Sequence, residues 1–239
     1  MRVLSLTSEL AEKPKSLREI QLLADQMLFY PDAKVIAFTS ATEGDGAEVV
    51  AWEYARLLAE QGKNVLWVDT DMRRPARAGA APGLSEYLSD RAERGEILCA
   101  TNYPRLYAIP SGTMPPNPTD LLSGQAFGSL LSGARATFDF VILSTASLGR
   151  YIDGALAAVR CDGAVLCISS RRTTEKDALN AKRLIKKADC RILGVVLNQT
   201  GALELFAPAP AAEKPLPVKK APVKKAKNDL LDDEEDDEI

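Results

Sequence analysis

The sequence predicts an α/β domain built on a doubly wound parallel sheet. Short, uncharged apolar runs, typical of strands buried on both faces, alternate with segments of helical periodicity. A length of 239 residues accommodates one such domain of about two hundred residues with an additional terminal segment. The five predicted strands are residues 35–38, 65–68, 140–143, 164–168 and 192–197.

Three helices are predicted beside these strands. Residues 16–29 carry apolar side chains at helical spacing and precede the first strand. Residues 48–61 follow that strand and end at Gly62, because a left-handed glycine commonly terminates a helix. Residues 173–188 begin with two threonines, which cap helices, and carry basic side chains in the last two turns, where they interact favourably with the helix dipole.

Composition divides the chain into three parts. Residues 1–30 form an N-terminal helical segment, residues 31–206 the α/β domain, and residues 207–239 a tail. The tail is rich in proline, alanine and lysine and then in acidic residues, so it cannot bury a core and is expected to be disordered. Its nine acidic and six basic residues account for the net charge of −3 of the whole chain. The tail is interpreted either as a solvating extension or as a short acidic docking segment.

The chain contains no histidine and four cysteines, none of them in a C-x-x-C pair. This composition excludes nucleophiles activated by histidine and gives no indication of a zinc site. No metal site of protein side chains is therefore expected. Any chemistry would depend on carboxylates, lysine, arginine or a bound nucleotide with its metal.

Hydropathy and charge also limit the location and the partners. The sequence has no run of about eighteen apolar residues and no secretory signal, so we expect a cytoplasmic protein without direct membrane insertion. Without the tail the formal charge is zero, which offers no basic field for nucleic acid. A nucleic-acid partner is not expected.

A glycine-containing loop connects the first predicted strand to the helix that follows. It includes Gly44, Asp45 and Gly46, and the helix begins near Ala47 and Glu48. A strand, a glycine-rich loop and a helix N-terminus together form the geometry in which backbone N–H groups bind phosphate. Two glycines alone are weak evidence of such a loop, so its identification depends on the segments downstream.

The downstream segments occur in the order found in one family. They are Val-Leu-Trp-Val-Asp-Thr-Asp-Met-Arg-Arg-Pro at 65–75, Gly-Leu-Ser-Glu-Tyr-Leu at 83–88, Pro-Pro-Asn-Pro within 111–122, Phe-Asp-Phe-Val-Ile at 138–142 and Leu-Gly-Val-Val-Leu-Asn at 193–198. Over about residues 14–200 the chain resembles the bacterial tyrosine kinases (BY-kinases), ATPases of capsular and exopolysaccharide chain-length control. This resemblance implies the P-loop NTPase fold, with ATP and Mg²⁺ as ligands.

The nucleotide-binding positions depart from the pattern of that family, whose loop reads Gly-Glu-Gly-Lys-Ser. Ala47 replaces the phosphate-binding lysine and Glu48 the magnesium-binding serine, while Ser144 stands where the family has a metal-site aspartate. A lost charge-assisted hydrogen bond costs about 1.5–3 kcal/mol, and a carboxylate about 4 Å from a phosphate costs roughly 4 kcal/mol. ATP affinity is therefore expected to fall by about a thousandfold. The alternative is that Glu48 coordinates a cation directly.

Other positions of this degenerate Walker-type site remain. The resemblance assigns Asp69 and Asp71 to the metal and the attacking hydroxyl, although both could simply be retained structure at a strand end. Arg73, with Arg74, is a candidate for anion binding or a solvated basic pair. Asn198 aligns with a base-contacting position, and its alternative role is that of a turn residue.

Two more features of the family are altered. Its Glu-x-x-Arg-x-x-Arg oligomer motif aligns on Arg18, Gln21 and Ala24. The ring-forming contacts of the family are therefore not expected, and an oligomer formed through other contacts remains an alternative. The C-terminal tyrosine cluster that serves as the autophosphorylation substrate is missing, because the last tyrosine is Tyr151.

These departures favour a non-catalytic, pseudokinase-like partner or regulator in exopolysaccharide or capsule synthesis and export, with no cofactor. Its expected partner is a membrane polysaccharide co-polymerase or another envelope polysaccharide protein, with residues 207–239 as a candidate contact, which would place it peripherally at the inner membrane. The alternatives are an active ATPase or tyrosine autokinase with atypical ligands (ATP and Mg²⁺), and a partition- or division-type positioning ATPase. A further alternative is that the tail acts alone and the domain only carries it.

Overall fold

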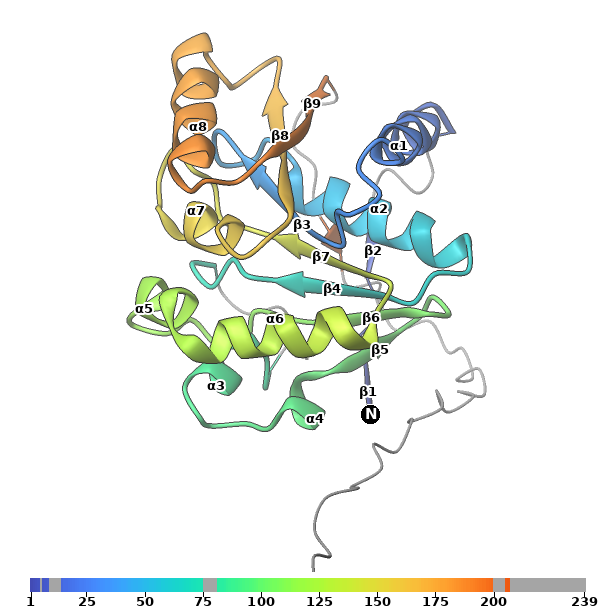
Figure 1. The fold of residues 1–239 in the computed structure, drawn as a ribbon, viewed down its shortest axis with the longest axis vertical. Coiled ribbons are helices and arrows are strands. Elements are labelled where there is room, and N and C mark those ends of the chain that lie inside the picture. Colours follow the sequence, from blue (N-terminus) through green and yellow to red (C-terminus); the bar gives the residue numbers. More distant parts are fainter. Residues whose placement is uncertain (5, 9–13, 75–80, 200–204, 207–239) are drawn as a thin grey trace, which may run out of the picture. The chain divides into compact units, whose positions relative to one another are not determined.

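The computed structural model describes residues 1–4, 6–8, 14–74, 81–199 and 205–206 (Figure 1). The predicted tail, residues 207–239, lies outside the described residues. No helix among the described residues is both long enough and apolar enough to span a bilayer.

The main sheet has eight strands in the order β1-β5-β6-β4-β7-β3-β8-β9. The five predicted strands are confirmed as its central strands and one edge, each within one or two residues of its expected bounds. The strands are β1 (Arg2–Leu4), β3 (Val35–Ser40), β4 (Val65–Asp69), β5 (Cys99–Thr101), β6 (Leu106–Ile109), β7 (Phe140–Ser144), β8 (Gly163–Ser169) and β9 (Ile192–Asn198).

Neighbouring strands of this sheet are parallel at every pairing except one. β5 and β6 run antiparallel, so the sheet is mixed rather than purely parallel as the sequence suggested. The two strands are only three and four residues long, and Arg105 in their connection has a positive φ of 67°. Strands this short carry too few residues to show a periodicity. β1, which pairs with β5, was likewise not predicted.

Helices cover both faces of the sheet, as expected for a doubly wound fold (Figure 1). α1 and α2 pack on one face, and the buried side chains of α3, α5, α6, α7 and α8 pack on the other. The helices are α1 (Pro14–Met27), α2 (Ala47–Glu60), α3 (Leu84–Leu88), α4 (Arg94–Ile97), α5 (Pro118–Ser123), α6 (Gln125–Thr137), α7 (Asp153–Ala158) and α8 (Glu175–Lys187).

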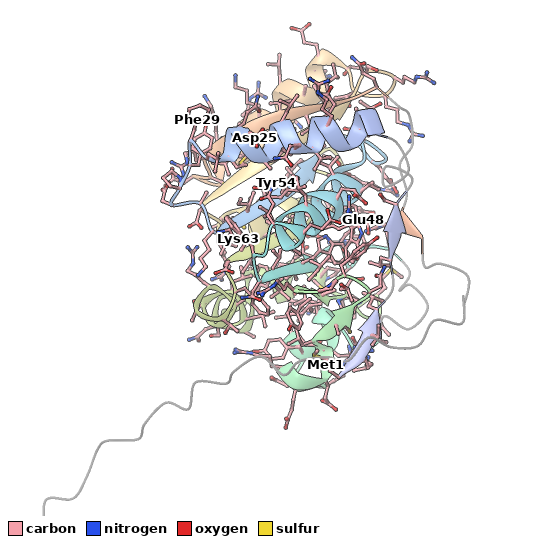
Figure 2. The ribbon with its side chains drawn as sticks, turned by 90° about the vertical axis from the view of Figure 1, so that its right-hand side faces the viewer. Met1, Asp25, Phe29, Glu48, Tyr54 and Lys63 are labelled. Atoms are coloured by element: carbon pink, nitrogen blue, oxygen red, sulfur yellow. The ribbon has the colours of Figure 1, made fainter. Side chains whose placement is uncertain are left out.

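The three predicted helices correspond to α1, α2 and α8. α8 begins as its sequence predicts, because the Thr174 side chain accepts a hydrogen bond from the Asp177 backbone N–H. α2 is buried along most of its length, between the sheet and α1 (Figure 2). Its Trp52 contacts Trp67 of β4 edge to face, with ring centroids 5.3 Å apart and planes at 87°. This pair fixes α2 against the strand that ends at Asp69.

A second, two-stranded sheet joins the N-terminal region to the end of the domain. β2 (Thr7–Ser8) pairs antiparallel with β10 (Leu205–Phe206). The Ser8 hydroxyl donates a hydrogen bond to the buried carboxylate of Glu53, which also pairs with Arg56 at 2.8 Å. The N-terminal region is thereby attached to α2.

Asp162 anchors the start of β3. Its carboxylate accepts hydrogen bonds from the backbone N–H groups of Lys34 and Val35, at 2.8 and 2.7 Å, and pairs with Arg135 at 2.8 Å. Burial opposes ionisation of this carboxyl, but Arg135 and the two N–H groups together lower its pKa below the ordinary 3.8.

We expect Asp162→Ala to lower the free energy of unfolding by about 1–3 kcal/mol at pH 7, because two backbone donors lose their acceptor. The folded-state pKa of Asp162 is depressed, so its stabilisation is present above the unfolded-state pKa and is lost as the pH falls through the folded value. The difference from the unaltered chain should therefore shrink below about pH 4. Urea unfolding at several pH values measures it. Asp32→Ala, at an exposed ion pair with Arg191, is the control and should change little.

Candidate functional site

The loop between β3 and α2 has the backbone form predicted for a phosphate-binding loop. Gly44 and Gly46 have φ angles of 83° and 91°, in the left-handed region that glycine adopts readily. Gly46, which has no side chain, occupies the N-cap position before the first turn of α2. Ala47 and Glu48 are the first two helical residues, and Figure 2 shows Glu48 at this end of α2.

Asp45 holds the loop in place through contacts with distant segments. Its buried carboxylate accepts hydrogen bonds from the Thr42 backbone N–H at 2.8 Å and from the Thr173 hydroxyl at 2.8 Å. The Asn198 side chain donates to the Asp45 carbonyl oxygen at 3.1 Å. Asn198 therefore lies at the loop, with its amide nitrogen donating to the backbone of the loop.

Arg74 lies among three carboxylates at the site. Its Nη1 is 2.7 Å from Glu48 Oε2, its Nε is 2.7 Å from Asp71 Oδ2, and its Nη2 is 3.6 Å from Asp69 Oδ1. The guanidinium thus connects the start of α2 to the end of β4 and the residues that follow it. The two retained aspartates and the substituted Glu48 are brought together, with an internal cation between them.

The three carboxylates of this cluster stabilise the charged form of Arg74. Burial alone would lower the pKa of Arg74, but Asp69, Glu48 and Asp71 outweigh it and raise that pKa. Arg74 is therefore a permanent cation. Three carboxylates around one guanidinium leave two negative charges in excess where a nucleotide phosphate would approach. Ala47, which is buried, adds no positive charge to offset them.

Ser144 lies directly beside Asp69 in the sheet. The two residues are register partners on β7 and β4, so their side chains are on the same face, towards α2. The Ser144 side chain is fully buried, and its Oγ has no hydrogen-bond partner among the described residues. A hydroxyl here cannot supply the negative charge that an aspartate would.

Arg73 points away from this cluster and is engaged elsewhere. Its Nε is 2.6 Å from Asp153 Oδ2, and its Nη2 donates to the Thr119 hydroxyl at 2.9 Å. The guanidinium also lies over the ring of Tyr151, with its carbon 4.5 Å from the ring centroid. The two arginines are therefore not a solvated basic pair. Each is ion-paired with carboxylates of this chain.

The sequence did not indicate the contact between Arg74 and Glu48, or the one between Arg73 and Asp153. These partners are 26 and 80 residues apart, so no local pattern relates them. One signal was present: the resemblance places the segments of Glu48 and Arg74 at the same site, and their charges are opposite.

Comparison with known proteins identifies the family. No family model matches the chain. The tyrosine-protein kinase CpsD of Streptococcus agalactiae is 36% identical over 172 residues, covering 70% of this chain and 75% of the relative. The succinoglycan biosynthesis transport protein ExoP of Rhizobium meliloti is 31% identical over 202 residues, covering 80% of this chain but 25% of that protein.

A solved structure agrees with these relatives. The crystal structure of the chimerical protein CapA2B2 superposes with a TM-score of 0.74 at 26% identity, covering 83% of this chain and 93% of the other. The similarity covers 70–83% of this chain in these three comparisons. The chain therefore belongs to the bacterial tyrosine-protein kinase family.

Proposed function

We propose that this chain is a non-catalytic, pseudokinase-like member of its family that acts as a partner or regulator in exopolysaccharide or capsule synthesis and export. The observation that carries the proposal is the position of Arg74 between Glu48, Asp69 and Asp71. The carboxylates that would serve a metal ion are already neutralised in part by a side chain of the chain itself.

The residues at the site do not fit Mg²⁺ and ATP. A magnesium ion would have to displace Arg74 from its ion pairs, and the ATP phosphates would then meet Glu48 without a lysine at position 47. Mg²⁺ favours sites in which a few carboxylates and phosphate oxygens complete an octahedron. Glu48 and Arg74 form an ion pair with each other instead. We therefore infer that the chain binds no cofactor.

The relatives suggest the kind of partner. The matched part of ExoP is a quarter of a protein named for transport in succinoglycan biosynthesis. We infer that this chain associates with a separate membrane co-polymerase or another envelope polysaccharide protein, and so lies at the membrane periphery. Affinity capture from the native cells tests this role, and recovery of no polysaccharide-export component would contradict it. Deleting residues 207–239 distinguishes binding through the tail from binding through the domain.

Calorimetric titration with ATP and ADP, with and without Mg²⁺, tests the loss of nucleotide binding. We expect no heat of binding at nucleotide concentrations up to about a millimolar, where a Kd of 1 mM corresponds to about −4 kcal/mol. Mg²⁺-dependent binding at micromolar concentrations would show that the site still works and would refute the non-catalytic role.

An ATPase or autokinase with atypical ligands is the second candidate, because Asp69 and Asp71 both remain at the end of β4. This candidate requires Arg74 to leave the two aspartates when nucleotide binds. It predicts Mg²⁺-dependent phosphate release that Asp71→Asn abolishes. The absence of phosphate release from the unaltered chain would eliminate this candidate.

A further inference from the structure

Tyr151 lies between two arginine side chains from different segments. The guanidinium carbon of Arg73 is 4.5 Å from the ring centroid, and that of Arg150 is 5.4 Å from it. The pKa of Arg73 is raised first by Asp153, against a smaller effect of burial, and also by the Tyr151 phenol. The pKa of Arg150 is raised first by Glu43 and then by the same phenol. Both guanidinium groups therefore lie against the ring of Tyr151.

The other five tyrosines are in different surroundings. Tyr54 is buried, and Tyr87 and Tyr107 pack against the core. Tyr103 lies beside Arg56, whose charge is already shared by Glu53 and Glu60, and Tyr30 lies beside a single arginine, Arg191. Tyr151 is half-buried, and its hydroxyl has no hydrogen bond to any residue that the structure describes.

The two arginines next to Tyr151 differ in how firmly they are held. Arg73 is fixed by Asp153, whose side chain is 2% exposed. Among the residues that the structure describes, Arg150 forms an ion pair only with Glu43, at 2.8 Å, and both side chains of that pair are more than half exposed. An exposed ion pair of this kind contributes little free energy, so Arg150 can exchange Glu43 for a stronger anion at small cost.

We propose that Tyr151 is a phosphorylation site, modified in trans by a catalytically active tyrosine kinase, with Arg150 and Arg73 binding the phosphate. The Tyr151 oxygen attacks the γ-phosphorus of ATP held by that kinase. A bond forms between this oxygen and the phosphorus, the bond from the phosphorus to the β–γ bridging oxygen breaks, and ADP leaves with the electron pair. The phenolic proton is released to a base of the kinase.

The phosphate would place a charge of about −1.5 to −2 between two guanidinium groups, which form strong hydrogen bonds to phosphate oxygens. The proposal builds on the non-catalytic function proposed above, because a chain that holds no ATP must receive the phosphoryl group from another kinase. An active kinase could then regulate such a chain by phosphorylating it.

The test incubates the purified full chain with Mg-ATP and an active tyrosine-protein kinase, whose own autophosphorylation confirms its activity. Mass spectrometry maps the phosphate. We expect it on Tyr151, with incorporation at least tenfold lower in Tyr151→Phe and unchanged in Tyr30→Phe, which also removes a hydroxyl beside an arginine. Phosphate on other residues only, or none while the kinase modifies itself, would overturn the proposal.

Two further measurements separate the parts of the argument. Phosphate incorporation by the chain with ATP alone would contradict the non-catalytic function. Absence of phosphate on Tyr151 when the active kinase is present would contradict the Tyr151 site. Phosphorus NMR then follows titration of the phosphotyrosine, whose second pKa is ordinarily about 6. We expect this pKa to be lowered in the modified chain and restored towards 6 in Arg150→Gln. An ordinary value in both proteins would show that the arginines do not bind the phosphate.

Discussion

The variant carrying Ala47→Lys, Glu48→Ser and Ser144→Asp is expected to bind Mg-ATP at least a hundredfold more tightly than the unaltered chain. The new ammonium provides a charge-assisted hydrogen bond of about 1.5–3 kcal/mol, and removing Glu48 relieves repulsion of up to roughly 4 kcal/mol at an effective dielectric constant near 20. Because Arg74 partly neutralises Glu48 in the unaltered chain, the gain should be smaller than the sum of these two effects.

Titration calorimetry of the two proteins side by side measures this gain. The matched control replaces Ala47 with Met instead of Lys and keeps the other two changes, so it has a side chain of similar length without the charge. This control should bind Mg-ATP with less than a tenth of the affinity of the lysine-containing variant. A repaired variant that is folded, as shown by urea unfolding, but still binds no ATP would show that something other than these three positions prevents binding. Arg74, which keeps its contacts with Asp69 and Asp71, would be the first residue to change.

Arg74→Ala should lower the free energy of unfolding by about 1–3 kcal/mol at pH 7.5, less than for breaking a fully buried pair because the Arg74 side chain is 36% exposed to solvent. The substitution leaves Glu48, Asp69 and Asp71 facing one another, and the Asp69 side chain is only 3% exposed. The mutual repulsion of the ionised carboxylates disfavours the folded variant, and protonation at low pH relieves it. The repulsion therefore grows as the pH rises. The deficit should therefore be largest above neutrality and smallest near pH 4.

Urea unfolding of the variant and of the unaltered chain at pH 4.5, 6 and 7.5 provides the comparison. Arg171→Ala removes an arginine whose exposed side chain has no interaction among the described residues, and it should change stability by less than about 0.5 kcal/mol. Adding Glu48→Gln to Arg74→Ala should recover part of the deficit, because it removes one of the repelling charges. A deficit independent of pH would mean that lost packing, rather than charge, explains the effect.

The sequence was sufficient for the parts of the fold that have a strong periodicity. The strands β3, β4, β7, β8 and β9 were predicted from uncharged apolar runs, and α2 and α8 carry recognisable ends at Gly62 and Thr174. β1, β5 and β6 could not be predicted, because three or four residues do not establish a pattern. The antiparallel pairing of β5 with β6 follows from a short connection that contains no glycine–asparagine turn signal.

The structure shows which of the candidate residues lie close together and which interactions they make. The loop, Asp69, Asp71, Ser144 and Asn198 do meet at one end of the sheet, because parallel strands deliver their carboxyl ends to the same edge. Which charge neutralises which was not predictable. That depends on side-chain reach in three dimensions, and Arg74 reaches Glu48 from a segment 26 residues further along the chain. Arg73 was expected near a nucleotide and instead fastens the residues after β4 to α7.

The perpendicular contact of Trp52 with Trp67 gives this chain a built-in optical probe. These are the only two tryptophans of the sequence, and both are completely buried. All indole fluorescence therefore originates where α2 packs on β4. Trp52 is five residues from Ala47 at the start of α2, and Trp67 is two residues before Asp69 on β4. Emission should be blue-shifted in the folded chain and move to longer wavelengths only when α2 separates from the sheet. Loss of the Arg74 contacts without separation of α2 should leave the emission spectrum unchanged. Fluorescence can therefore distinguish rearrangement of the site from unfolding.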